Sequence, residues 1–256
     1  MRILAVETAT RTGSWALVED GGVVAAGEGD GAVAHDVRLP HPLVAMLAGR
    51  GLTLRDVDAF AVATGPGSFT GLRVGIATVQ GLAMATGKRV IPVPTLDAIA
   101  EDAASAPEAA ALDYMAVWLD GQRGEIFAAL YAIRRQAGGE NAAAAAVPGL
   151  LMPPQVGPPA LLGAEIADLI GDARAGFAGD GAHRYRDAIE TLGLREARVF
   201  PITPIAPPLA RLAWQRREAA VAPHAIIPVY VRRPDAELAR DRAARAAQAS
   251  GPPSER

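Results

Sequence analysis

The chain of 256 residues contains no cysteine, few aromatic residues and no excess of basic residues. The absence of cysteine excludes a disulfide framework, a thiolate metal site and a cysteine nucleophile. Lysine and arginine together number 25 against 28 aspartates and glutamates, which gives a net charge of −3. Proteins dedicated to nucleic-acid binding usually carry a basic excess, so this balance argues against that class.

Long hydrophobic runs are also missing. The N-terminal stretch MRILAVETAT has one basic residue and an apolar run too short for a signal peptide. No later segment reaches the length that a membrane span requires. We therefore expect a soluble, cytoplasmic protein with no membrane partner.

The most informative stretch is Phe60–Gly87, FAVATGPGSFTGLRVGIATVQGLAMATG. Its pattern predicts a buried strand, a glycine-rich turn and a helix capped by Ser68 or Thr70. No Gly-Lys-Ser/Thr follows the turn, so it is not a Walker loop. The helix is apolar on almost every face, so something must cover its second face. That cover is either the core of a large domain or a second chain, with Gly71 and Gly75 allowing close approach.

The segment TGPGSFTGLRVGIATVQGLA, which begins at Thr64, resembles the signature of the TsaB (YeaZ) family. The C-terminal segment Pro-Val-Tyr-Val-Arg-Arg is also similar to that family. The resemblance implies an α/β fold of two actin-like (ribonuclease H-like) domains, with mixed sheets flanked by helices. We expect domain I over 1–104 plus 206–234, a smaller domain II over 105–205, and a flexible tail over 235–256.

Members of this family are non-catalytic subunits of the bacterial complex that forms N6-threonylcarbamoyladenosine in the anticodon loop of tRNAs. The resemblance implies a catalytic, metal-bearing paralogue (TsaD) as direct partner, with the ATPase subunit TsaE and tRNA reached through the complex. It also implies a homodimer when the chain is alone. The predicted partner interface consists of Leu43, Met46, Leu47, Gly71, Leu72, Gly75, Ile76, Val79 and Leu82. Charging Ile76 or Leu82 is expected to abolish association without unfolding.

The first strand ends on an acid and leads into a turn of hydroxyl residues and glycine, which is how actin-like ATPases present phosphate and magnesium. This pattern makes Glu7, Thr8, Thr10 and Gly13 candidate nucleotide-binding residues. A plain hairpin with Glu7 capping the sheet explains the same residues. ATP or ADP binding is therefore left open, and no cofactor is required. A second strand ending at Asp120 echoes the first, which indicates two related halves.

Catalytic residues and metal ligands are not evident. Catalytic relatives carry paired histidines where this chain has Thr95-Leu96-Asp97, and there is no histidine between His41 and His183. We therefore predict no metal site and no catalytic residue. The alternative is an actin-like small-molecule kinase or ATPase acting alone, with Glu7, Thr8, Thr10 and Asp120 around the nucleotide.

Three further expectations concern local structure. The alanine-, glycine- and proline-rich stretch 137–159 is predicted to be a mobile loop. A single helix is expected over Ala182–Leu192. A strand-like segment is expected over Ile226–Val231.

Overall fold

The computed structural model describes residues 1–29, 39–135 and 146–232, and its strands form two mixed five-stranded sheets. The sheet of the first lobe has the order β3-β2-β1-β4-β5. Its strands are β1 (Arg2–Glu7), β2 (Ser14–Glu19), β3 (Gly22–Glu28), β4 (Ala59–Ala63) and β5 (Arg89–Val93). The first three strands are antiparallel neighbours, whereas β4 and β5 run parallel to β1.

The sheet of the second lobe repeats this plan. Its order is β10-β9-β6-β7-β8, with β6, β7 and β8 antiparallel and β9 and β10 parallel to β6. The strands are β6 (Tyr114–Asp120), β7 (Ile126–Arg135), β8 (Ala146–Gly157), β9 (Arg174–Ala178) and β10 (Glu196–Val199). The repeated topology confirms the predicted fold class of two related α/β halves.

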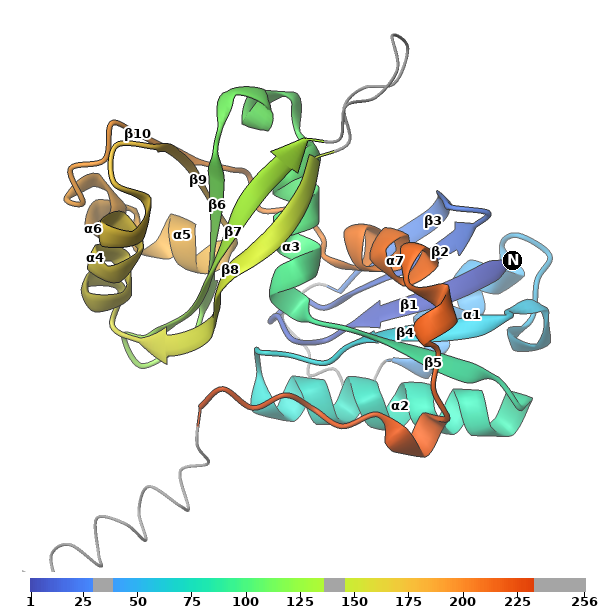
Figure 1. Cartoon of the computed structure of the whole chain (residues 1–256). Coiled ribbons are helices and arrows are strands. Elements are labelled where there is room, and N and C mark those ends of the chain that lie inside the picture. The colour runs from blue at the N-terminus through green and yellow to red at the C-terminus, as the bar shows by residue number, and fades with distance from the viewer. Residues whose placement is uncertain (30–38, 136–145, 233–256) are drawn as a thin grey trace, which may run out of the picture.

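Helices flank both sheets (Figure 1). They are α1 (Pro40–Ala48), α2 (Phe69–Thr86), α3 (Thr95–Ser105), α4 (Pro159–Ile170), α5 (Asp180–Arg184), α6 (Arg186–Glu190) and α7 (Ala206–Gln215). Single 3-10 turns cover Leu54–Asp56, Pro107–Ala111, Arg217–Ala219 and Pro223–Ala225. Helices α1 and α2 pack on one face of the first sheet, whereas α7 packs on β1 and β2 from the other face.

Helix α2 begins and ends where its sequence indicates. The Ser68 hydroxyl accepts a hydrogen bond from the backbone N–H of Gly71 at 3.2 Å and caps the N-terminus. Gly87 closes the helix in the left-handed conformation, with φ of 68°. None of the described helices has the length and hydropathy of a membrane span.

One continuous core joins the two lobes. It contains buried residues from the first sheet, such as Ile3 and Ala61, together with Met115 and Phe127 of the second. Helix α3 lies between the lobes and contacts β6, β7, β8 and β9 as well as α7 (Figure 1). The chain therefore crosses to the second lobe after α3 and returns with α7, whereas the domain boundaries given above stay a prediction.

The structure corrects two of the local expectations. Strand β8 occupies Ala146–Gly157, within the stretch predicted to be a loop, because it pairs with β7 along most of its length. It lies at the edge of the sheet, where prolines such as Pro148 are tolerated. The helix expected over Ala182–Leu192 is divided into α5 and α6. The expected tail 235–256 lies outside the described residues.

Candidate functional site

Glu7 ends β1 and is the centre of a hydrogen-bonded turn. Its side chain is buried, with 1% exposed. One carboxylate oxygen accepts the backbone N–H of Thr10 at 2.6 Å, and the other accepts the hydroxyls of Thr10 at 3.0 Å and Ser14 at 3.1 Å. The Ser14 oxygen in turn accepts the backbone N–H of Ala206 at 2.9 Å. Glu7 therefore ties β1 and β2 to the start of α7.

Three of the four candidate nucleotide-binding residues come together in this turn. The backbone N–H of Gly13 donates to the Thr10 hydroxyl at 3.3 Å. The fourth residue, Thr8, is directed elsewhere, because its hydroxyl donates to the carbonyl of Gly71 in α2 at 2.8 Å. Nucleotide binding by these residues stays a prediction.

A cavity of about 650 Å³ lies between the lobes, with Glu7 and Thr10 in its wall. Ile99 and Asp102 of α3 form another side, and Asp180 at the start of α5 is contributed by the second lobe. Among the described residues, Asp120 is not part of this wall. The kinase alternative places magnesium between Glu7 and Asp120, so it receives no geometric support from the cavity.

The acids of the second lobe are held by the chain itself. Asp180 accepts the backbone N–H of Asp120 at 2.8 Å. Burial raises the pKa of Asp180, and the charge of nearby Asp120 acts in the same direction. The Asp120 carboxylate accepts the backbone and side-chain N–H groups of Gln122 and lies 3.4 Å from Arg184. Asp180 was not among the predicted site residues, since its Gly-Asp-Gly context is a weak signal.

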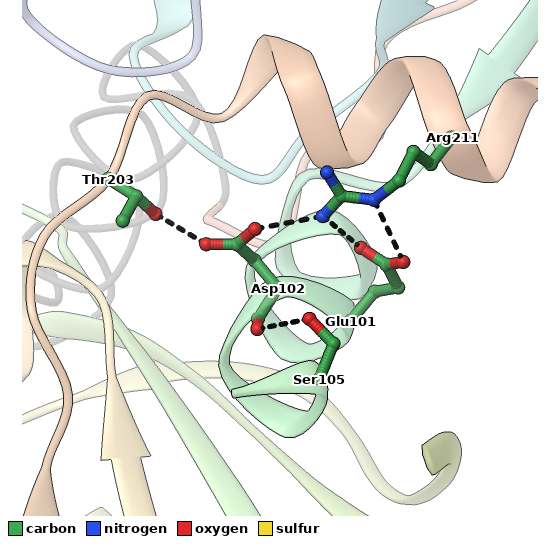
Figure 2. A network of polar contacts seen from close by, with 5 residues as sticks. All are labelled: Glu101, Asp102, Ser105, Thr203 and Arg211. Carbon is green, nitrogen blue, oxygen red and sulfur yellow. Dashed lines mark hydrogen bonds and ion pairs between the residues drawn. The ribbon is translucent and has the colours of Figure 1, made fainter. Parts of the chain in front are cut away.

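A polar network joins α7, α3 and the linker between β10 and α7 (Figure 2). The guanidinium of Arg211 donates to both carboxylate oxygens of Glu101, at 3.2 and 3.0 Å, and to Asp102 at 2.9 Å. The other oxygen of Asp102 accepts the Thr203 hydroxyl at 2.8 Å. Burial disfavours the charge of Arg211, but the hydrogen bonds and charges of the two acids outweigh it and raise its pKa.

Asp97 of α3 serves an interlobe contact. Asp97 accepts the Tyr131 hydroxyl at 2.9 Å and the guanidinium of Arg216 at 3.0 Å. Burial raises the pKa of Tyr131, and Asp97 adds to this effect. In the part of the chain that the structure describes, no group of three or more His, Cys, Asp or Glu side chains is arranged to hold a metal ion.

Most of the predicted partner interface lies in the chain's own core. Seven of its nine residues are buried, namely Leu43, Leu47, Gly71, Leu72, Gly75, Ile76 and Val79. Met46 and Leu82 are partly buried and pack on the core cluster that contains Leu43, Leu47, Ile76 and Val79. Because Ile76 is only 4% exposed, a charge there would be placed in the core. The expectation that charging Ile76 leaves the fold intact is therefore corrected.

The two helix glycines allow a close approach within the chain. A Cβ on Gly71 would lie 2.0 Å from the carbonyl oxygen of Thr8, and one on Gly75 would lie 2.1 Å from the Thr8 hydroxyl. Both separations are impossible for real side chains. Only glycine therefore lets the first turns of α2 rest on the end of β1.

The C-terminal segment, Val221–Arg232, covers part of the second face of α2 (Figure 1). Gln80 donates to the carbonyls of Pro223 at 2.9 Å and Ile226 at 3.0 Å. Arg73 donates to the Tyr230 hydroxyl at 2.8 Å. The strand expected over Ile226–Val231 is not formed, because these described residues have an irregular backbone. The chain itself thus covers part of the apolar surface of α2.

The rest of that face is open. We name it the outer α2 surface, and it consists of the exposed residues Ala77, Gly81, Met84 and Ala85. Met84 is 70% exposed. A Cβ on Gly81 would meet nothing within 4 Å. This surface is therefore apolar, and the described part of the chain leaves it exposed.

Comparisons with known proteins identify the family. A family model for tRNA N6-adenosine threonylcarbamoyltransferase (TsaD) matches residues 21–247. The tRNA threonylcarbamoyladenosine biosynthesis protein TsaB of Escherichia coli K12 is 43% identical over 103 residues, which are 40% of this chain and 44% of that protein. The chain thus matches less than half the length of this relative.

Two further matches cover more of the matched protein's length. An uncharacterized protein of Mycobacterium bovis is 37% identical over 151 residues, which are 57% of this chain and 68% of that protein. The structure of YeaZ from Pseudomonas aeruginosa superposes with a TM-score of 0.69 at 27% identity, covering 90% of this chain and 99% of that one. The chain therefore belongs to the TsaD-related family as a TsaB/YeaZ-type member with an actin-like fold.

Proposed function

We propose that this chain is a non-catalytic subunit that binds a TsaD-type catalytic paralogue in the synthesis of N6-threonylcarbamoyladenosine on tRNA. Family membership and the TsaB relatives support the biosynthetic role. The observation that carries the subunit role is the outer α2 surface. A helix on the surface of a globular domain normally presents polar residues to water. Thr70 and Arg73 are exposed polar residues near the start of α2, but from Ala77 to Ala85 the exposed residues are small or apolar.

The shape of this surface suits a helical partner. Alanine and glycine at 77, 81 and 85 are four residues apart and therefore share one side of the helix. Their small size lets the backbone of a second helix approach closely. Helix α1 covers the same face of the sheet and exposes Val44, Ala45 and Ala48. We infer that the paralogue docks a related helix pair against α1 and α2.

The transfer chemistry belongs to the partner in this proposal. The stretch Thr95-Leu96-Asp97 contains no histidine, and Asp97 is engaged by Tyr131 and Arg216. TsaE and tRNA are reached through the complex, in the cytoplasm. The same surface supports a homodimer when the paralogue is absent, because exposed apolar patches tend to find partners.

Reconstituted tRNA modification tests the proposal. The host's TsaD and the other components are incubated with unmodified tRNA, and the modified nucleoside is quantified by mass spectrometry. We expect formation only when this chain is added, and a strong reduction with Gly81→Glu. The control is Ala164→Glu on the exposed side of α4, which places the same charge on the second lobe.

Two results would overturn the proposal. Full product formation without this chain would show that it is not a subunit of the complex. Turnover of Mg·ATP by the isolated chain, at a rate unaffected by TsaD, would favour the kinase or ATPase alternative.

A further inference from the structure

We propose that the interlobe cavity binds a small organic cation, a molecule with an apolar body and a protonated amine. The proposal is independent of the partner-binding role, because the cavity and the outer α2 surface share no residue. It concerns a ligand of this chain alone.

The cavity has the dimensions of a small-molecule site. Its volume of about 650 Å³ lies within the usual range of ligand pockets, about 300–1,000 Å³. Both lobes and the linker before α7 contribute to its wall. The apolar part of the wall includes Ile99, Ala103, Leu119, Phe200, Ile205 and Pro208. Such a wall favours a ligand with a hydrophobic body.

The charged part of the wall is predominantly acidic. It contains five carboxylate residues, Glu7, Glu28, Asp102, Glu108 and Asp180. Two guanidinium residues, Arg11 and Arg198, accompany them. Arg198 already donates to the carbonyl of Glu108 at 3.2 Å and lies 3.9 Å from Glu196. A phosphate-bearing ligand would therefore meet net repulsion, whereas an ammonium group would be attracted.

Two of these acids are available to a ligand. Within the described part of the chain, the side chains of Glu28 and Glu108 have no hydrogen-bond or ion-pair partner. Both residues are exposed, so they lie where a ligand enters from solvent. An ammonium group offers three N–H donors, and ionised carboxylates only accept. The rim is thus complementary to an amine.

Several of the backbone N–H donors that a phosphate would need already donate within the chain. Phosphate loops present free backbone N–H groups to the anion. Here the N–H groups of Thr10 and Gly13 donate within the first turn. In the second turn, the N–H of Gly121 donates to the Glu125 carbonyl and that of Gln122 to Asp120. These four N–H groups are therefore not free to bind an anion.

Calorimetric titration of the full chain tests this proposal with three probes. Tyramine carries an aromatic body and an amine, 4-ethylphenol is its neutral analogue, and Mg·ATP represents a nucleotide. We expect tyramine to bind with a Kd of about 1 mM or tighter, and 4-ethylphenol to bind at least about tenfold more weakly. Mg·ATP is expected to give no binding heat.

Two variants locate the site. Ala103→Phe fills the cavity from α3 and should abolish tyramine binding. The double variant Glu28→Gln, Glu108→Gln changes only exposed side chains, so it should fold normally. It should remove most of the preference for tyramine over 4-ethylphenol. If circular dichroism shows that Ala103→Phe does not fold, the preference of the double variant for tyramine over 4-ethylphenol tests the site.

Several outcomes would overturn the inference. They are equal affinities for tyramine and 4-ethylphenol, an unchanged preference in the double variant, and no binding of tyramine at about 10 mM, ten times the weakest expected Kd. Tighter binding of Mg·ATP than of tyramine would also overturn it, and would assign the cavity to a nucleotide.

Discussion

Replacing Gly71 by alanine should destabilise the protein, although alanine is the better helix former. The added methyl group would lie 2.0 Å from the carbonyl oxygen of Thr8, whereas ordinary van der Waals contact begins at 3.4 Å. The obstacle is backbone and not the end of a flexible side chain. Either the end of β1 or the first turn of α2 must move.

The size of the destabilisation follows from two unfavourable effects and one favourable effect. Overpacking of this kind costs about 1–3 kcal/mol. Displacement also weakens the hydrogen bond from the Thr8 hydroxyl to the Gly71 carbonyl, worth about 1 kcal/mol. Helix propensity returns about 1 kcal/mol. We expect Gly71→Ala to lower the free energy of unfolding by about 1–3 kcal/mol.

Gly81→Ala is the matched control, because it makes the same chemical change in the same helix. A Cβ at this position meets nothing within 4 Å, so only the propensity gain remains. This variant should be more stable than the parent by about 0.5–1 kcal/mol. Urea denaturation followed by circular dichroism measures both changes. A Gly71→Ala protein as stable as the Gly81→Ala protein would refute the close contact between β1 and α2.

Two further predictions concern polar groups. Arg211→Ala leaves the carboxylates of Glu101 and Asp102 without their shared cation and should lower the free energy of unfolding by about 1–2 kcal/mol, a value reduced by partial exposure. Arg211→Lys should have an intermediate stability. An unchanged urea midpoint in Arg211→Ala would contradict this prediction. The backbone N–H and hydroxyl of Thr53 lower the pKa of Asp56 below 3.8. The associated stabilisation is present above that ordinary value and is lost as pH falls through the lowered pKa. Thr53→Ala should raise the pKa, measured by NMR titration of the carboxyl carbon.

Local signals in the sequence were sufficient for the turn and helix at the centre of the first lobe. The apolar run, the glycine turn and Ser68 specify a strand, a bend and a cap within a few residues of one another. Such features depend on local backbone chemistry. The repeated strand that ends in Asp120 likewise indicates the second lobe, whose sheet repeats the plan of the first.

The faces of α2 could not be assigned from the sequence. Because the helix is apolar on nearly every side, periodicity does not distinguish the residues on the sheet from those facing out. The spacing of Gly71 and Gly75 indicated a close approach, but not that Thr8 would be the neighbour. The C-terminal cover is held in part by backbone carbonyls that accept from Gln80, and backbone carbonyls carry no side-chain signal.

The cavity could not be predicted from the sequence either. Its wall combines residues from the first turn, α3 and the linker before α7, which are far apart in the chain. Thr8 and Thr10 are the same residue type in the same turn, yet the Thr8 hydroxyl donates to α2 and the Thr10 hydroxyl donates to Glu7. Such differences arise only from the packing of helix against sheet.

Light scattering on a sizing column, with this chain and its host's TsaD mixed in equal amounts, tests whether the outer α2 surface binds the paralogue. We expect a heteromeric peak for the parent chain and for Ala164→Glu, and separate components for Gly81→Glu. A heteromer that forms equally well with Gly81→Glu, or no heteromer with the parent chain, would contradict the assignment of the outer α2 surface as the docking site.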